Sequence, residues 1–237
     1  MIKNYIKIAL RSLLKSKATS VINVLGLSIG MACCIVIFLF VQNEMSYDKF
    51  HSKSDKIFRV LTIDKALGVS NSLVGITLPV LGASMEDNFP EVVNRVRMLP
   101  QGRQLITYEQ QGFYTDHFAY AEPSIFEMFD FKLVEGDVEN ALKNPNTVVV
   151  TQSMAQKTFG TDNPIGKRID IGGQPGLEVV AVMKDVTENS HLNFDVIVSM
   201  QQADTTSGFA QFLNSWQSIS MVTYVELASP ANEETVE

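Results

Sequence analysis

The longest apolar run in the chain covers residues 21–41, VINVLGLSIGMACCIVIFLFV, and contains no charged residue. At about 1.5 Å per helical residue, a run of this length reaches roughly 32 Å, enough to cross a hydrocarbon core of about 30 Å. The pattern therefore predicts one transmembrane helix over 21–41. A cleaved secretory signal or lipoprotein signal is the alternative, but a secretory signal has a shorter apolar region that ends at a small-x-small site, which residues 38–44 lack.

The segment before this run combines basic and apolar residues at helical spacing. Its basic residues Lys3, Lys7, Arg11 and Lys15 follow one another at steps of four, beside an apolar stripe that begins with Ile2 and Ile6. This pattern predicts an amphipathic leader helix over 1–20 whose basic residues lie at the cytoplasmic membrane surface. A plain basic topogenic leader is the simpler alternative. Since acidic residues first appear after position 43, the positive-inside rule predicts a cytoplasmic N-terminus and an exported main domain.

One face of the predicted crossing is small and polar. Asn23, Gly26, Gly30 and Cys33 share a stripe that includes one GxxxG pattern. Such a stripe favours close packing against another membrane helix, with Asn23 hydrogen-bonded across the contact. The common occurrence of glycine in membrane helices is the alternative explanation.

Beyond residue 42, alternating strand patterns are mixed with short helical ones, which predicts an α+β domain. A strand at 56–64, a helix at 77–88 and a strand at 92–99 form one βαβ unit, and a further strand at 222–228 is expected to pair with 56–64. We therefore expect a two-lobed domain over 42–237: the two halves of a split α+β subdomain at 56–99 and 222–237, and an inserted lobe at 100–221. Ser229 and Pro230 begin a further helix pattern, so we expect the C-terminal half to continue beyond residue 237.

The inserted lobe reads as a mixture of short strands and helices. Its expected strands are 105–108, 113–119, 147–151, 168–171, 177–183 and 196–199, and its expected helices are 124–129 and 152–159.

The charge distribution limits the classes of partner that the protein can bind. The whole chain has a formal net charge of −7, and removal of the five basic residues before residue 21 makes the remainder still more acidic. An acidic exported domain argues against nucleic acid as a partner. Both cysteines lie in the apolar run, so the exported part is expected to fold without disulfides.

Candidate chemistry is sparse, and we expect no catalytic residue, cofactor or metal. GTDNPIGKR at 160–168 is a near-match to a phosphate loop, but its spacing is wrong and Arg168 stands where a hydroxyl residue belongs. Asp48, His51 and Asp55 form a conceivable metal-ligand set, but we read them as part of a solvated exit from the membrane. His117 and His191 look isolated, and the polar stretch 185–193 reads as a solvated loop that is available to a partner.

Several longer motifs resemble the permease subunits of MacB/FtsX-like ABC systems. The resemblance rests on NYIKIALRSLLKSKATSVINVLGLSIGMACCIVIFLFV, SYDKFHSKSDKIFRV, AEPSIFEMFDFKLVEGD, NPNTVVVTQSMAQKTFGTDNPIGK and VVAVMKDVTENSHLNFDVIVSM. It implies a non-enzymatic permease of the bacterial inner membrane with a MacB-like periplasmic core domain.

The implied partners are a cytoplasmic ABC ATPase, a second permease copy or homologue and the lipid bilayer, with a periplasmic adaptor as a further possibility. The resemblance also implies that residues 46–59 carry motion between the membrane and the first strand. A single-pass, membrane-anchored binding or sensor protein is the alternative function, and an anchored hydrolase is the third.

Overall fold

The fold is described from a computed structural model covering residues 4–5, 7–8, 11, 15–63, 73–137, 140–187, 189–201, 206–230 and 236. It divides into two compact units, residues 1–47 and residues 48–237. The five apolar residues expected along the leader stripe (2, 6, 9, 10 and 13) and Lys3 lie outside the described residues, as does most of the helix expected after Ser229.

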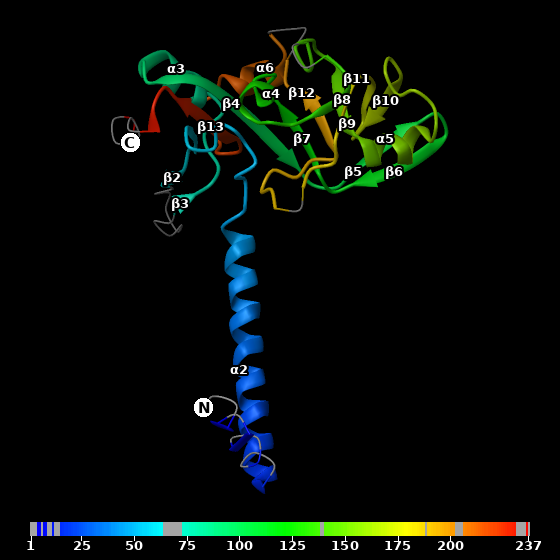
Figure 1. The fold of residues 1–237 in the computed structure, drawn as a ribbon. Helices are drawn as coiled ribbons and strands as arrows, with labels where there is room; N and C mark the ends of the chain where they lie inside the picture. Colours follow the sequence, from blue (N-terminus) through cyan, green and yellow to red (C-terminus); the bar gives the residue numbers. More distant parts are fainter. Residues whose placement is uncertain are drawn as a thin grey trace. The chain divides into compact units, whose positions relative to one another are not determined.

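The first unit is dominated by helix α2, Lys17–Glu44 (Figure 1). It is long and apolar enough to cross a membrane, and all of the predicted crossing at 21–41 lies within it. Described leader residues from Asn4 to Lys15 are also helical, and Ser16 separates them from α2. The expectation of a single long apolar helix after a helical leader is thus confirmed for the described residues.

The second unit is an α+β domain built around one large mixed sheet. Its strands are β1 Ile57–Arg59, β4 Val92–Gln101, β5 Gln104–Tyr108, β6 Gln111–Thr115, β7 Phe118–Ala121, β8 Leu133–Gly136, β9 Thr147–Thr151, β10 Arg168–Ile171, β11 Gln174–Met183, β12 Val196–Ser199 and β13 Val222–Leu227. Its helices are α3 Leu81–Asn88, α4 Ile125–Met128, α5 Gln152–Phe159 and α6 Gly208–Leu213. A separate small sheet pairs β2 Thr62–Ile63 with β3 Leu73–Val74.

The sheet order is β1-β13-β4-β7-β12-β9-β11-β10-β5-β6, with β8 paired to β11 (Figure 1). At one end β1 and β4 are both antiparallel to β13, so they run parallel to each other on its two sides, and α3 connects them. This is a split βαβ arrangement. The predicted pairing of 222–228 with 56–64 is confirmed, with Phe58 opposite Val225.

The strand β4 continues beyond this arrangement. Its first part pairs with β13, and Met98 to Gln101 pair with β7, so β4 connects the split βαβ arrangement to the rest of the sheet. Every residue of β9, β12 and β13 is buried. Strands that are rich in Val and Ile and buried throughout are typical of a sheet covered on both faces.

The core has two main parts. One lies around α4 and includes Met98, Ile125 and Met183, and the other lies around α5 and includes Val150 and Phe159. The expected strands 147–151, 168–171 and 196–199 and the expected helix 152–159 have the predicted bounds.

Several predicted elements differ from the structure. The strand predicted at 56–64 is divided, because Val60 donates its N–H to Thr223 and the chain then leaves the sheet for β2. The helix predicted at 77–88 begins only at Leu81, since Pro79 disfavours helical geometry just before it and Thr77 bridges to Met221.

The strand predicted at 113–119 is two strands, β6 and β7. Thr115 Oγ1 accepts the N–H of His117 at 3.1 Å where β6 ends, and the chain then continues into β7, which pairs with β4 and β12 rather than with β5. The sequence reasoning missed β3, β8 and α6, which are all too short to show a clear periodic pattern.

Candidate functional site

The chain enters the second unit through a compact segment, residues 48–56, here called the exit segment. Asp48 has φ 56°, and successive turns follow: the N–H of His51 bonds to the carbonyl of Asp48, and that of Ser54 to the carbonyl of His51. The N–H of Ile57 then bonds to the carbonyl of Lys53, at the start of β1. The segment is thus neither an extended linker nor a continuous helix, and its backbone follows a series of hydrogen-bonded turns.

The first attachment of the exit segment is to residues 189–191. The N–H of Asp48 donates to the carbonyl of Asn189 at 3.1 Å. Its carboxylate Oδ2 lies 2.6 Å from Nδ1 of His191, and Oδ1 accepts the backbone N–H of His191 at 3.1 Å and the hydroxyl of Ser190 at 3.3 Å. One carboxylate therefore organises the whole loop before β12.

His191 extends this attachment to the sheet. Its Nε2 forms a short hydrogen bond with the hydroxyl of Tyr224, a residue of strand β13 that is 4% exposed. Burial raises the pKa of Tyr224 to about 12, with a smaller opposing effect of Arg59, so the phenol remains protonated. Asp48, His191 and Tyr224 thus form a continuous polar chain from the exit segment to β13.

The second attachment is the buried ring of His51, which is 2% exposed. Its Nδ1 accepts the N–H of Asp130 at 3.0 Å, and the ring packs against Phe50, Phe129 and Phe131 with centroid distances of 4.0, 5.0 and 5.6 Å. An accepting Nδ1 leaves the proton of a neutral imidazole on Nε2. Among the described residues Nε2 has no hydrogen-bond partner. Burial lowers the pKa of His51; the charges of Asp48 and Asp130 oppose that effect and His191 adds to it.

Two further contacts complete the site. The N–H of Ser52 donates to the carboxylate of Asp130, and this bond lowers the pKa of that carboxyl. Lys53 Nζ lies 2.9 Å from Oε2 of Glu226 on β13 and donates to the carbonyl of Glu127 at 3.0 Å. The exit segment is therefore attached to three places: the end of α4, the loop before β12, and β13.

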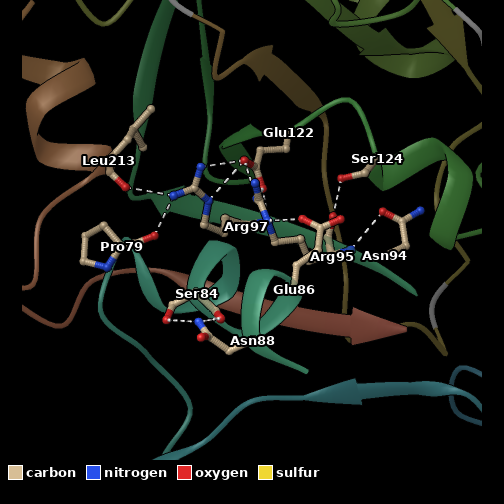
Figure 2. A network of polar contacts seen from close by, with 10 residues as sticks. All are labelled: Pro79, Ser84, Glu86, Asn88, Asn94, Arg95, Arg97, Glu122, Ser124 and Leu213. Carbon is tan, nitrogen blue, oxygen red and sulfur yellow. Dashed lines mark hydrogen bonds and ion pairs between the residues drawn. The ribbon is translucent and has the colours of Figure 1, made fainter. Parts of the chain in front are cut away.

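A buried ion-pair network braces the same sheet (Figure 2). Arg95 and Arg97, two residues apart on β4, both bind the carboxylate of Glu122, at 2.7 and 2.6 Å. Arg97 also donates to the carbonyls of Pro79 and Leu213, at 2.6 and 2.8 Å. Figure 2 shows its guanidinium between the segment before α3 and the end of α6.

The charge of Glu122 is well compensated in this network. Burial alone raises its pKa, but the hydrogen bonds and charges of Arg97 and Arg95 outweigh burial, so the pKa is lowered. Arg95 also pairs with Glu86 of α3, with Nε 2.8 Å from Oε2. The network therefore joins α3, β4 and α6 into one framework.

The predicted helix-packing residues Asn23, Gly26, Gly30 and Cys33 are all exposed on α2. A Cβ atom added at Gly26 or Gly30 meets nothing within 4 Å. The face is open, and its packing against another helix stays a prediction. Of the predicted membrane-surface residues, Lys7, Arg11 and Lys15 are helical and exposed, and Lys3 lies outside the described residues.

The structure corrects the solvated-exit interpretation. His51 is buried and Asp48 pairs with His191, while Asp55 is exposed, so these three do not converge on a metal. In the part of the chain that the structure describes, no group of three or more His, Cys, Asp or Glu side chains is arranged to hold a metal ion. His191 is not isolated, and its loop is an attachment point rather than a plain solvated loop.

The segment 160–168, which nearly matches a phosphate loop in sequence, does not have the structure of one. Lys167 pairs with Asp162 at 2.7 Å, and strand β10 begins at the next residue, where a phosphate loop requires a helix.

Comparisons with known proteins agree with this architecture. The family model described as MacB-like periplasmic core domain matches residues 20–237. The uncharacterized ABC transporter permease YvrN of Bacillus subtilis is 21% identical, over 79% of this chain and 48% of its own length. The present chain therefore spans about half the length of that curated relative.

Three solved structures share the fold. A domain of a permease protein from Porphyromonas gingivalis has a TM-score of 0.64 at 20% identity, covering 78% of this chain and 80% of that one. The extracellular domain of the noncanonic ABC-type transporter YknZ from Gram-positive bacteria has a TM-score of 0.52 at 16% identity, covering 76% and 87%. The periplasmic region of MacB from Actinobacillus actinomycetemcomitans has a TM-score of 0.52 at 14% identity, covering 78% and 81%.

Proposed function

The chain belongs to the family of MacB-like periplasmic core domains, and on that premise we propose that it is the permease subunit of an ABC-type export or mechanotransmission system. In this proposal a separate cytoplasmic subunit hydrolyses ATP, and the permease converts the resulting movement of its membrane helices into movement of the exported domain. The chain itself carries no catalytic step.

The observation that supports the proposal most strongly is the threefold attachment of the exit segment. A segment that only tethers a domain needs no buried side chains, yet His51 is 2% exposed and Asp48 holds the loop 189–191. Lys53 and the His191–Tyr224 contact both lead to β13, which lies between β1 and β4. Displacement of the exit segment is therefore passed directly to the interior of the sheet.

The membrane arrangement follows from charge and composition. We propose that the N-terminus is cytoplasmic, that the leader at 1–20 lies on the inner membrane surface through Lys3, Lys7, Arg11 and Lys15, and that residues 42–237 face the periplasm. Within that domain we propose porter-like halves at 56–99 and 222–237 around an inserted lobe at 100–221. We propose that the stripe from Asn23 to Cys33 packs against other membrane helices of the permease dimer.

Topology is tested with reporter fusions after residue 60 in the full-length permease. At this fusion site, a reporter that works only outside the cytoplasm should be active. A reporter that works only in the cytoplasm should be inactive at the same site. The opposite pattern overturns the orientation.

Coupling is tested with the full-length permease purified with its ATPase. We expect no hydrolysis of ATP by the permease alone, hydrolysis in the complex, and an ATP-dependent change in the distance between labels on the two exported domains. Two results together would favour a membrane-anchored sensor instead. No ATPase would co-purify with the permease, and the exported domain by itself would change conformation when a ligand binds.

A further inference from the structure

The most unusual side chain in the exit segment is His51, a histidine with a buried ring in a segment of charged and polar residues. Its Nδ1 accepts the N–H of Asp130, and three phenylalanine rings surround it. We propose that His51 makes the attachment of the exit segment dependent on pH: a neutral ring holds the segment against Phe129 and Phe131, and a protonated ring releases it. This inference rests on the proposed function, since it concerns regulation of the same site.

The observed hydrogen bond to His51 can form with the neutral ring but not with the protonated ring. In the neutral ring the lone pair of Nδ1 receives the Asp130 N–H at 3.0 Å. Protonation places a hydrogen on that lone pair, so two N–H groups face each other across the contact. The other nitrogen, Nε2, is buried and has no acceptor among the described residues, so the imidazolium gains no new hydrogen bond there.

The charged groups around His51 do not replace this lost contact. Asp48, from its own segment, and Asp130, from the segment after α4, both favour a charged ring, whereas His191, from the loop before β12, opposes it. Both carboxylates already have partners: Asp48 accepts from His191, and Asp130 accepts from Ser52.

Among the residues that the structure describes, the remaining neighbours of His51 offer it no free negative charge. Lys53 is paired with Glu226, and Tyr224, which packs on Phe129 with a centroid distance of 5.4 Å, has a pKa of about 12 and stays neutral. Burial of the ring therefore dominates, and the pKa of His51 is lowered.

The direction of the pH effect follows from this lowered pKa. The folded state prefers the neutral ring, so His51 contributes its full stability above pH 6.5, the ordinary pKa of a histidine side chain. That contribution is lost as the pH falls below 6.5 towards and through the pKa of the folded state. A domain outside the cytoplasm meets the pH of its surroundings directly, so acidification there weakens the coupling segment.

The test measures amide hydrogen exchange in the full chain in lipid nanodiscs, at about pH 7.5 and about pH 5.5, with correction for the intrinsic exchange rate. The informative amides are those of Ser52 and Asp130, which donate to the Asp130 carboxylate and to His51. In the wild type their protection should fall on acidification, by at most about tenfold per pH unit, the limit for one proton. His51→Asn, which keeps an acceptor that does not titrate, should show equal protection at both pH values. The matched control is His117→Asn, at an exposed histidine, which should behave like the wild type.

The proposal is overturned if protection in the wild type is the same at both pH values, or if His51→Asn retains the pH dependence. If His51→Asn does not fold, NMR titration of the histidine rings in the wild type decides. The ring of His51 must titrate over the same pH range in which protection is lost, and a different range contradicts the proposal. These measurements need no ATPase, so a negative result for the pH effect says nothing against the coupling function. Conversely, the pH effect can still be measured if no ATP-dependent movement is found.

Discussion

The carboxylate of Asp48 lies 2.6 Å from Nδ1 of His191, although 143 positions separate the two residues in the sequence. Because His191 also bonds to Tyr224, a single imidazole joins the first residue of the second unit to strand β13, which lies between β1 and β4. The contact ties the exit segment, most of whose residues are exposed, to a strand whose residues are all buried.

The Asp48 contact predicts a specific effect of Asp48→Asn. This change removes the charge while keeping a residue that tolerates the positive φ of 56° at this position. The free energy of unfolding should fall by about 1 kcal/mol, since both side chains are partly exposed. The amide of His191, which donates to Asp48, should exchange faster. The control Asp55→Asn, at an exposed aspartate of the same segment, should leave both quantities unchanged; equal effects of the two substitutions contradict the assignment.

Substitution of Glu122 should lower the free energy of unfolding more strongly, because its carboxylate balances the charges of two arginines. Glu122→Gln leaves Arg95 and Arg97 without their counter-charge in a site where the glutamate side chain is only 12% exposed. We expect a loss of about 3 kcal/mol, as for other buried ion pairs that lose one partner. Glu127→Gln, at an exposed glutamate, should cost far less. Urea unfolding of both variants measures the difference, and a loss no larger than that of Glu127→Gln shows that the network does not brace the sheet.

The same network predicts an acid dependence. The pKa of Glu122 is lowered from 4.5 in the folded state, so its ionised form contributes stability above pH 4.5. That contribution is lost as the pH falls below 4.5 through the folded-state pKa. A series of unfolding measurements in this range should show a steeper loss of stability in the wild type than in Glu122→Gln. Parallel curves contradict the prediction.

Much of the fold can be read from the sequence, because local patterns determine it. Strands such as 147–151 and 196–199 each contain three consecutive β-branched apolar residues, and helix 152–159 has Thr151 as its N-cap and Gly160 as its C-cap. The pairing of β13 with β1 also followed from the βαβ pattern.

The candidate site was less accessible to sequence reasoning. Asp48, His191 and Tyr224 come from three distant segments, and their contact depends on the tertiary fold. The phenylalanines around His51 were a usable signal: FEMFDF at 126–131 places three aromatic residues in a short stretch, although no local rule joins them to residue 51.

The tyrosine at the end of the polar chain predicts a stability change at high pH. Tyr224→Phe keeps the buried ring but removes the hydroxyl that bonds to His191, so we expect a loss of about 1 kcal/mol near neutral pH. The pKa of Tyr224 is raised from 10.0 to about 12, so its protonated form stabilises the fold below pH 10 and this contribution is lost as the pH rises through 12. The alkaline loss should be absent in Tyr224→Phe and present in the control Tyr114→Phe, which changes an exposed tyrosine. Alkaline titration followed by circular dichroism tests it.

The open face of α2 predicts a defect in assembly. Gly26→Leu with Gly30→Leu adds apolar bulk that suits lipid but blocks close approach of another helix, so membrane insertion should persist while the full permease fails to assemble. Ala32, half-way around the helix from Asn23 at 100° per residue, provides the control Ala32→Leu. Cross-linking of membranes from cells producing each variant measures assembly, and intact assembly of the double glycine variant shows that the stripe faces lipid.

The most direct test of coupling adds a flexible linker between helix α2 and the exit segment and, apart from a spin label, leaves the sequence of residues 48–237 unchanged. Four glycines are inserted between Met45 and Ser46 in the full permease–ATPase complex, with Cys33 and Cys34 replaced by Ser and a spin label at exposed Gln156 of α5. The control carries the same insertion in the exposed turn at Gly172 and Gly173. The distance between labels on the two copies, measured by pulsed EPR with and without ATP, should change in the control but not in the first variant, while both hydrolyse ATP. An unchanged ATP-dependent movement after insertion at Met45 would contradict the role assigned to the exit segment.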